Sequence, residues 1–397
     1  MKSPIFLNRV LLRNYKSIAD CDVRLGPLTY LVGANGAGKS NFLDALQLVR
    51  DALSISLDNA LNTRGGLTEV RRRSSGHGRG RPTNVGIRLD FTLDGAIPGH
   101  YAFDVAALAG YGYAVQTEEC AVDAAYFRVE RGVLRSSTEP AFPAVTPDRL
   151  ALVGASGMAA FRPVFDALTS MGFYNLNPKS MREPQNPQDG RLLKPGGENI
   201  ASVLGQLQRE APERMAEIRN HLKTVAPMVH GVERKQIGPF ETLEFRQEMA
   251  GTKHLFPAQN MSDGTLRALG VLTALFQGSR NETPLLIGIE EPETALHPAT
   301  SAALREALAK ASEQRQIIVT SHSPDLLDSP DITADQLLTV VSQDGKTRMA
   351  PLDQASRSAM RDQLFSAGEL LRLNQLDPDI TLLDTQRHSP LFEGALP

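Results

Sequence analysis

The residues whose types and spacing can do chemistry begin with a glycine-rich segment near the N-terminus. Residues 33–40 read GANGAGKS, a complete G-x-x-x-x-G-K-S pattern. In such a loop the glycines let backbone N–H groups turn inward around phosphate oxygens. Lys39 then reaches the outer phosphates, and the hydroxyl of Ser40 ligates Mg²⁺. The pattern predicts a site for ATP and Mg²⁺, and a glycine-rich turn that fits by chance is the alternative. The predicted lining is Gly33, Ala34, Asn35, Gly36, Ala37, Gly38, Lys39, Ser40 and Asn41.

The segments on either side of this loop are the ones that must position it. Residues 28–32 form a short apolar run, which indicates a buried strand, and apolar residues recur at helical spacing after Asn41. Strand, loop and helix in this order are the context in which the motif carries meaning. The helix adds its positive N-terminal end to the phosphate site.

A second group of polar residues follows two later strands. The apolar run 284–289 is typical of a buried parallel strand and ends in Glu290 and Glu291. A helix over 299–312 leads to a strand over 316–320, which ends in Ser321 and His322. This βαβ order predicts that the parallel sheet continues. Two solvated carboxylates and a capping histidine are the alternatives.

The whole chain bounds the class of protein. It has 397 residues, a formal net charge of −3 and two cysteines, Cys21 and Cys120. This composition indicates a soluble globular protein with neither a disulfide framework nor a zinc site. No apolar run approaches the roughly 18 residues of a membrane span, and the N-terminus is not a signal peptide. We therefore expect a cytoplasmic protein without a membrane partner.

The middle of the chain has a different character. Alternating apolar residues over 85–93 and several short runs up to residue 129 indicate a meandering antiparallel sheet. Two short helices are predicted from Asn199 and from Pro212, with no sustained heptads. Residues 95–257 therefore read as a compact, partly helical lobe inserted between 1–94 and 258–372, with 373–397 as a tail.

A basic run lies between the first helix and this sheet. It has five arginines, no acidic residue and several glycines and serines, which favour a loop. A contact with the phosphate backbone of DNA and a solvated hairpin tip remain open. The arginines are Arg71, Arg72, Arg73, Arg79 and Arg81.

Four segments in order, GANGAGKS, MSDGT at 261–265, EEPE at 290–293 and TSHSP at 320–324, resemble the head of an ABC-type ATPase. The likeness is to the stand-alone SMC/RecF/OLD-like ATPases of bacteria. It implies an α/β P-loop NTPase fold, with a mixed sheet, flanking helices and an antiparallel β subdomain.

The resemblance also implies roles for residues. Glu290 joins Ser40 in holding Mg²⁺, although the family more often has Asp there. Glu291 orients and polarises the attacking water, and His322 hydrogen-bonds the γ-phosphate. Lys16, in an Asn-aromatic-basic-Ser turn, is a candidate phosphate contact, and a solvated turn lysine is the alternative.

Ser262 and Gly264 match the family's signature, which contacts the γ-phosphate from a second subunit. An ordinary serine helix cap is compatible with that role. The signature implies a head-to-tail homodimer around two ATP. No glutamine is assigned to the Q-loop, for which Gln185 and Gln188 are candidates. The chain is too short after His322 for the Toprim domain of OLD nucleases, so any nuclease would be a separate chain.

Three functions compete. The first is a nucleotide-driven clamp or switch on double-stranded DNA, in repair or in antiviral defence, with a separate effector. The second is a slowly hydrolysing, nucleotide-gated module that binds a protein partner. The third is an ABC transporter subunit, which the large insertion and the absent signature glutamine disfavour.

Overall fold

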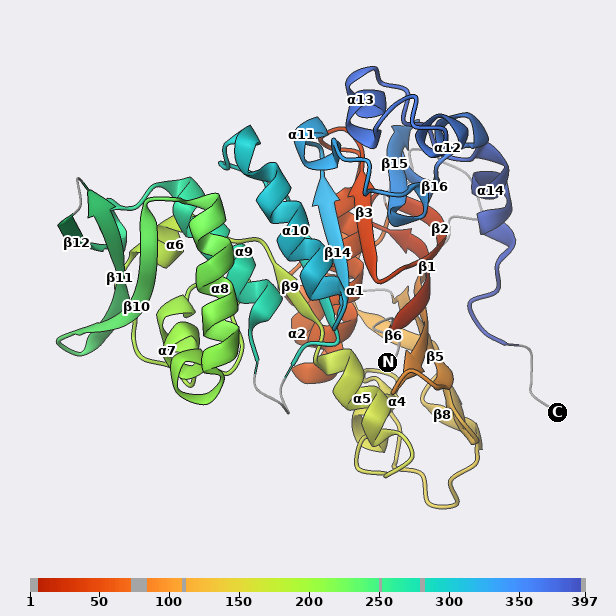
Figure 1. The fold of residues 1–397 in the computed structure, drawn as a ribbon. Coiled ribbons are helices and arrows are strands. Elements are labelled where there is room, and N and C mark those ends of the chain that lie inside the picture. The colour runs from red at the N-terminus through yellow and green to blue at the C-terminus, as the bar shows by residue number, and fades with distance from the viewer. Residues whose placement is uncertain (1–5, 73–83, 109–111, 250–251, 279–282, 394–397) are drawn as a thin grey trace. The chain divides into compact units, whose positions relative to one another are not determined.

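The computed structural model describes residues 6–72, 84–108, 112–249, 252–278 and 283–393 (Figure 1). The chain forms two compact units. Unit 1 contains residues 1–171, 333–365 and 370–397, and unit 2 contains residues 172–332 and 366–369. Each unit brings together segments that lie far apart in the sequence, so the fold is set by long-range pairing.

Unit 1 is built on a mixed sheet in which the strands follow the order β8-β7-β6-β5-β4-β1-β2-β16-β15-β3. Most neighbours are antiparallel, whereas β16 runs parallel to β2 and β15 runs parallel to β3. The predicted meander is confirmed as the hairpin series from β4 to β8. The strands are β1 (Leu7–Tyr15), β2 (Ile18–Arg24), β3 (Leu28–Val32), β4 (Asn84–Leu93), β5 (Ile97–Ala107), β6 (Tyr113–Val122), β7 (Ala125–Glu130), β8 (Val133–Ser137), β15 (Leu337–Gln343) and β16 (Lys346–Pro351).

Helices of unit 1 cover this sheet. The longest, α1, follows β3 directly and buries its apolar side chains, Phe42 and Leu46 among them, as the helical spacing predicts. The helices are α1 (Lys39–Ser54), α2 (Leu57–Asn62), α3 (Leu67–Val70), α4 (Ala151–Ala155), α5 (Arg162–Thr169), α12 (Gln354–Arg361), α14 (Ile380–Thr385) and the 3-10 turns η3 (Ala334–Gln336) and η4 (Gln386–His388). Helix α13 (Ala367–Arg372) contains the point where the chain passes between the units.

Unit 2 contains the parallel strands β14-β13-β9 and a separate antiparallel sheet β10-β11-β12. The predicted βαβ unit is confirmed as β13, α10 and β14, whose strands are almost fully buried. The strands are β9 (Gly172–Tyr174), β10 (Val229–Ile237), β11 (Phe240–Met249), β12 (Thr252–Pro257), β13 (Leu286–Glu290) and β14 (Gln316–Ser321). The helices are α6 (Pro178–Arg182), α7 (Ile200–Glu210), α8 (Pro212–Val225), α9 (Asp263–Phe276), α10 (Ser301–Ser312), α11 (Pro324–Leu327), η1 (Ala258–Asn260) and η2 (Pro298–Thr300).

The predicted lobe 95–257 is distributed over both units. Its first strand, β5, pairs with β4 along the whole of β4, so the segment continues the sheet of unit 1. Its later part, from α6 to β12, lies in unit 2. The predicted domain boundaries, after residues 94, 257 and 372, stay a prediction.

The C-terminal segment, which the sequence indicates only as a tail, packs on unit 1. Gln386 donates to the carbonyls of Met349 and Asp22, and Arg88 donates to the carbonyl of Leu391. Arg88 is only 7% exposed because this segment covers it. No helix among the described residues is both long and apolar enough to cross a bilayer.

Candidate functional site

The glycine-rich loop joins β3 to α1 in unit 1, in the predicted context. Gly36 and Gly38 have φ of 77° and 104°, a conformation that glycine adopts without strain. A Cβ atom on Gly33 would lie 2.0 Å from the carbonyl oxygen of Val340, and one on Gly38 would lie 2.0 Å from Oγ1 of Thr347. The glycines are therefore required both by the backbone and by the close approach of β15 and β16.

Lys39 shows that the loop fits a phosphate group. Its side chain is only 5% exposed, and its ammonium donates to the carbonyls of Gly33 (2.8 Å) and Ala34 (3.0 Å), across the loop. A buried ammonium held over a ring of backbone groups is suited to an anion, which supplies the charge that buried cations need. The residues present fit the β- and γ-phosphates of a nucleotide.

The turn between β1 and β2 supports the loop from the side. Ser17 accepts a hydrogen bond from Asn41 (2.6 Å) and shares one with Thr347 (2.7 Å), and Thr347 donates to the carbonyl of Ala37 (2.7 Å). Thr347 lies more than 300 residues from the loop, and no local signal in the sequence indicates this contact. Lys16 forms an ion pair with Asp44 on α1, at 2.5 Å. Its role as a phosphate contact stays a prediction.

Of the two adjacent carboxylates, Glu290 ends β13 in unit 2 and Glu291 follows it, as the sequence predicts. Glu291 has φ of 42°, a left-handed conformation that is uncommon for a residue with a side chain. Its N–H donates to the carbonyl and to the hydroxyl of Thr320, both at 3.1 Å. Oε1 of Glu291 lies 3.1 Å from Nδ1 of His322. Both side chains are more than a third exposed, so the pair faces open space. Strained residues of this kind gather at functional sites.

Arg267, which the sequence did not single out, holds the end of β13. Its guanidinium, on α9, donates to the carbonyls of Glu290 (3.0 Å), Glu291 (2.9 Å) and Leu176 (2.6 Å). The side chain is 7% exposed, and this burial lowers the pKa of Arg267 below its ordinary value. The helix that begins with the signature is thus bonded to the strand end that carries both carboxylates.

Glu293 is a third carboxylate of the same segment and is 9% exposed. Its Oε1 accepts from the hydroxyl of Ser321 (2.7 Å) and from the N–H of His322 (3.4 Å). Burial raises the pKa of Glu293, and the hydrogen bond from Ser321 opposes that change. Glu293 therefore positions the backbone from which His322 projects. Its place in the EEPE segment was the signal that could have found it.

The signature begins α9. Ser262 caps the helix by accepting the N–H of Thr265 at 3.1 Å, so the serine-cap reading is correct and its γ-phosphate role stays a prediction. A Cβ atom on Gly264 would lie 2.5 Å from the carbonyl oxygen of Ala295, whose φ is 64°. Glycine is therefore needed where the start of α9 meets the loop after β13.

The remaining predicted residues fall into the two units. Lys16 and residues 33–41 belong to unit 1, whereas Glu290, Glu291, Ser262, Gly264 and His322 belong to unit 2. Ser40 belongs to unit 1 and Glu290 to unit 2, and their role as Mg²⁺ ligands stays a prediction. Within the described residues there is no cluster of three His, Cys, Asp or Glu that could hold a metal alone.

The structure places both Q-loop candidates and the first two arginines of the basic run. Gln185 donates to the carbonyl of Ser180, and the N–H of Gln188 donates to Ser202, so both are engaged within unit 2. Of the basic run, Arg71 and Arg72 lie beside the β1–β2 turn. Residues 73–83, with Arg73, Arg79 and Arg81, lie outside the described residues.

Comparisons with known proteins agree with this geometry. Residues 6–76 match the family "AAA ATPase domain", and residues 180–328 match "AAA domain, putative AbiEii toxin, Type IV TA system". An OLD nuclease from Thermus scotoductus is 49% identical over 43 residues, which are 11% of this chain and only 8% of that nuclease.

Solved structures show the same fold. An SMC head bound to the C-winged helix domain of ScpA superposes with a TM-score of 0.57 at 13% identity, over 90% of this chain and 99% of that one. An SMC head with an extended coiled coil, bound to the C-terminal domain of ScpA derived from Pyrococcus furiosus, gives a TM-score of 0.51 at 12% identity, over 90% and 99% of the two chains. The chain therefore has the α/β fold of an SMC head, and two of its segments are similar to AAA-type ATPase domains, which supports the resemblance to the SMC/RecF/OLD-like ATPases.

Proposed function

We propose that the protein binds ATP with Mg²⁺ and hydrolyses it to ADP and phosphate. The observation that carries this proposal is the pair formed by Glu291 and His322, at 3.1 Å, next to a strand end that Arg267 and Thr320 hold in a strained conformation. Such a carboxylate can orient a water molecule for attack on a phosphate. The phosphate loop in unit 1 supplies the complementary part, because Lys39 and the backbone N–H groups can hold the β- and γ-phosphates.

Each residue has a role in this proposal. Ser40 and Glu290 hold Mg²⁺, which neutralises charge on the phosphates when it is bound. Glu291 orients the water and accepts its proton, and its bond to His322 fixes the direction of the carboxylate. As an imidazolium, His322 donates to Glu291 through Nδ1 and has its second N–H, on Nε2, with which to donate to the γ-phosphate. Lys39 stabilises the charge that develops on the transferred group.

We further propose that ATP drives a head-to-tail homodimer. Ser262 and Gly264 open α9 and present a helix N-terminus, which attracts anions. In SMC-like heads this signature contacts the nucleotide of the partner subunit, so each dimer would enclose two ATP. Binding would close the dimer and hydrolysis would open it, which makes the protein a nucleotide-driven switch.

The switch is proposed to act in the cytoplasm on double-stranded DNA, in repair or in antiviral defence, with a separate nuclease or other effector. The support is the likeness of one segment to an OLD nuclease, the toxin–antitoxin family matched by residues 180–328, and the arginines that begin at Arg71. Arginines bind the phosphate backbone without reading its sequence.

A second candidate is a slowly hydrolysing module that binds a protein partner without DNA. It is favoured by Glu290, which replaces the usual Asp, and by Asp263 and Thr265, which depart from the signature of transporter-type heads. A transporter subunit is disfavoured because Thr265 stands where that signature has glutamine.

The test compares ATP hydrolysis by the wild type and by Glu291→Gln, with and without double-stranded DNA, while the mass in solution is followed. Stimulation by DNA, with an ATP-locked dimer in the variant, supports the switch on DNA. A dimer without stimulation supports the protein-binding module. Equal turnover by the wild type and the variant contradicts the role of Glu291. Neutralising the arginines between 71 and 81 should flatten the salt dependence of DNA binding, and an unchanged slope would remove them from the interface.

A further inference from the structure

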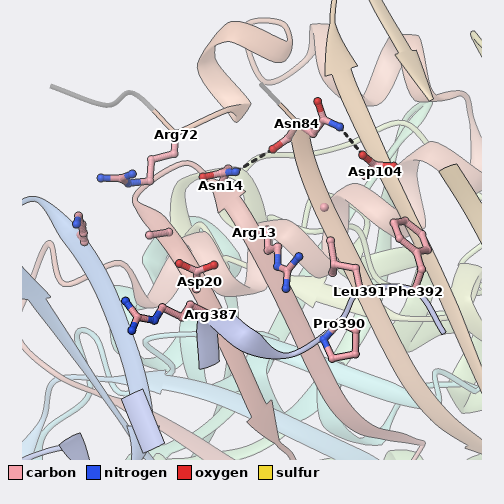
Figure 2. Close-up of a pocket in the computed structure, with 13 residues that line it drawn as sticks. Arg13, Asn14, Asp20, Arg72, Asn84, Asp104, Arg387, Pro390, Leu391 and Phe392 are labelled. Atoms are coloured by element: carbon pink, nitrogen blue, oxygen red, sulfur yellow. Dashed lines mark hydrogen bonds between the residues drawn. The ribbon is translucent and has the colours of Figure 1, made fainter. Parts of the chain in front are cut away.

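Unit 1 contains a pocket that the proposed reaction does not use. Its volume is about 850 Å³, which is in the range of pockets for small ligands (Figure 2). It lies where the end of β1 and the starts of β2, β4 and β16 meet the C-terminal segment. Its lining is Arg13, Asn14, Ala19, Asp20, Arg72, Asn84, Gly86, Asp104, Lys346, Arg387, Pro390, Leu391 and Phe392.

Four cationic side chains from separate parts of the sequence line this pocket: Arg13, Arg72, Lys346 and Arg387. Arg13 donates to the carbonyl of Ser389, and Arg387 donates to His388. In the described part of the chain, none of the four forms an ion pair with a carboxylate. Elsewhere in the same unit, arginines such as Arg9 and Arg64 are paired with aspartates. With these four cations against the two acids Asp20 and Asp104, the described lining of the pocket has an excess of positive charge.

The backbone holds Arg72 in place. Its N–H donates to the carbonyl of Asn14 at 2.8 Å, and Arg71 forms an isolated bridge with Tyr15. Its Nε, by contrast, is buried and has no hydrogen-bond partner among the described residues. The same is true of Nε in Arg182, Arg219, Arg267 and Arg315, so the free donor of Arg72 matters because this side chain lines the pocket and can bond a ligand there. Figure 2 shows the side chain of Arg72 beside Asn14.

Asp104 presents the opposite kind of group. It is 9% exposed; its Oδ2 accepts from the amide of Asn84, its Oδ1 is buried, and Thr117 lies opposite it on β6 and also hydrogen-bonds to the carboxylate. Asn84 in turn accepts from the amide of Asn14 at 3.1 Å, as the dashed lines in Figure 2 show. The pocket therefore offers an acceptor on one side and cations on the other.

The C-terminal segment forms one wall. Cδ1 of Leu391 would lie 2.3 Å from a Cβ atom on Gly86, so β4 carries glycine where the segment packs against it. Arg88 and Arg128 fix this segment through the carbonyls of Leu391 (3.2 Å) and Glu393 (3.0 Å). The wall is built by specific contacts, and the concavity is a feature of the folded chain.

We propose that this pocket binds a small phosphorylated ligand that also carries hydroxyl or amine donors, as a mononucleotide does. Arginine and lysine are the side chains that bind phosphate best, and a phosphate oxygen would accept a hydrogen bond from Nε of Arg72. A ribose hydroxyl or a base amine would donate a hydrogen bond to Oδ1 of Asp104. The walled shape and the acids Asp20 and Asp104 disfavour a nucleic-acid backbone, which calls for an extended basic surface.

The pocket is separate from the phosphate loop. None of the residues that line it comes from 33–41. Strand β16 divides the two, because Lys346 faces the pocket whereas the next residue, Thr347, donates to the carbonyl of Ala37 in the loop. A ligand here would therefore bind in addition to ATP.

The experiment measures the binding of AMP, by calorimetry, to the full chain carrying Lys39→Ala, which disables the phosphate loop. The pocket variant adds Arg72→Gln and Lys346→Gln, two side chains that form no hydrogen bond or ion pair with the described residues. The matched control adds Arg131→Gln and Arg149→Gln, which remove two exposed arginines of unit 1 outside the pocket. Inorganic pyrophosphate and a short DNA duplex are titrated in parallel.

We expect AMP to bind the Lys39→Ala chain and the control equally, and the pocket variant at least about tenfold more weakly. Restoring the charge with Arg72→Lys should recover part of the affinity. The proposal is overturned if AMP does not bind, or if the control loses as much affinity as the pocket variant. It is also overturned if only the duplex binds in a pocket-dependent way, which would assign the pocket to nucleic acid. If the pocket substitutions in a chain that keeps Lys39 weaken ATP binding as much as Lys39→Ala does, the pocket is part of the ATP site and the proposal is overturned as well.

Discussion

The phosphate loop of unit 1 and the acidic strand end of unit 2 position their functional groups in different ways. The loop is a continuous segment of eight residues whose conformation follows from its own glycines, such as Gly36 and Gly38. The strand end depends on side chains from other elements, because Arg267 and Thr320 hold the backbone of Glu291, and Glu293 holds that of His322. The motif of the loop is thus contained in one short segment, although Thr347 and Ser17 support it from the side, whereas the strand end is held mainly by side chains from other elements.

This difference has an energetic consequence. A substitution of Lys39 should mainly remove a contact with the nucleotide, whereas side chains at Gly33 or Gly38 would clash with β15 or β16. A substitution around the strand end disturbs buried hydrogen bonds, so it affects stability and chemistry together. The predictions below use this contrast, from the largest expected effect to the smallest.

Lys39→Ala should weaken ATP binding by at least about a hundredfold, because charge-assisted hydrogen bonds to phosphate are lost. The melting temperature of the free protein should change little. Calorimetric titration of ATP measures the effect, and Lys310→Ala on α10, an exposed lysine, is the control. Normal ATP binding by Lys39→Ala would contradict the assignment of the phosphate loop.

Glu291→Gln should lower the rate of ATP hydrolysis about 10²- to 10⁴-fold, since general-base catalysis contributes in that range. ATP binding should persist, because the amide keeps the size of the carboxylate. Phosphate release under single-turnover conditions measures the loss, and Glu313→Gln on the surface of unit 2 should leave the rate unchanged. A wild-type rate would remove Glu291 from the reaction.

Arg267→Met should reduce the free energy of unfolding by about 2–4 kcal/mol, because three buried carbonyls lose a donor. It should also slow hydrolysis in the molecules that stay folded. The matched control is Arg305→Met, since Arg305 donates to the carbonyls of Asp325 and Leu326. That variant should lose stability without a comparable loss of turnover. If both variants keep the same rate per folded molecule, Arg267 does not position Glu291.

Glu293→Gln tests whether the buried carboxylate makes the free energy of unfolding depend on pH. Because its pKa is raised in the folded protein, the folded state binds this proton more tightly than the unfolded state does. Its contribution to stability is present below the ordinary carboxyl pKa and is lost as the pH rises through the raised value. Urea unfolding at about pH 4 and about pH 8 should therefore show a smaller pH dependence in Glu293→Gln than in the wild type. An identical pH dependence of stability in the variant and the wild type would contradict the raised pKa of Glu293.

The sequence predicted the parts that are encoded locally. The G-x-x-x-x-G-K-S pattern identified the loop between β3 and α1, and apolar runs that end in Glu290 and Ser321 identified the parallel strands of unit 2. These predictions succeed because a short motif or a periodicity of a few residues favours one local conformation by itself.

What the sequence could not show depends on contacts between distant segments. Nothing near Thr347 indicates that it would donate to Ala37, and Arg267 within an apolar helix reads as an ordinary polar position. The C-terminal segment looked like a tail, yet Gln386 and Leu391 are buried on unit 1. The strands β10, β11 and β12 were also missed, because charged residues interrupt their alternation.

The most direct test of the proposed head-to-tail dimer is a mixing experiment. Lys39→Ala disables the phosphate loop, and Ser262→Arg disables the signature, so each variant alone should be inactive. In a mixed dimer, one site would combine the intact loop of one chain with the intact signature of the other. Equal mixing should therefore restore about a quarter of wild-type ATP hydrolysis, from one site in half of the dimers. An inactive mixture, from variants that each fold, would contradict a site shared between two chains.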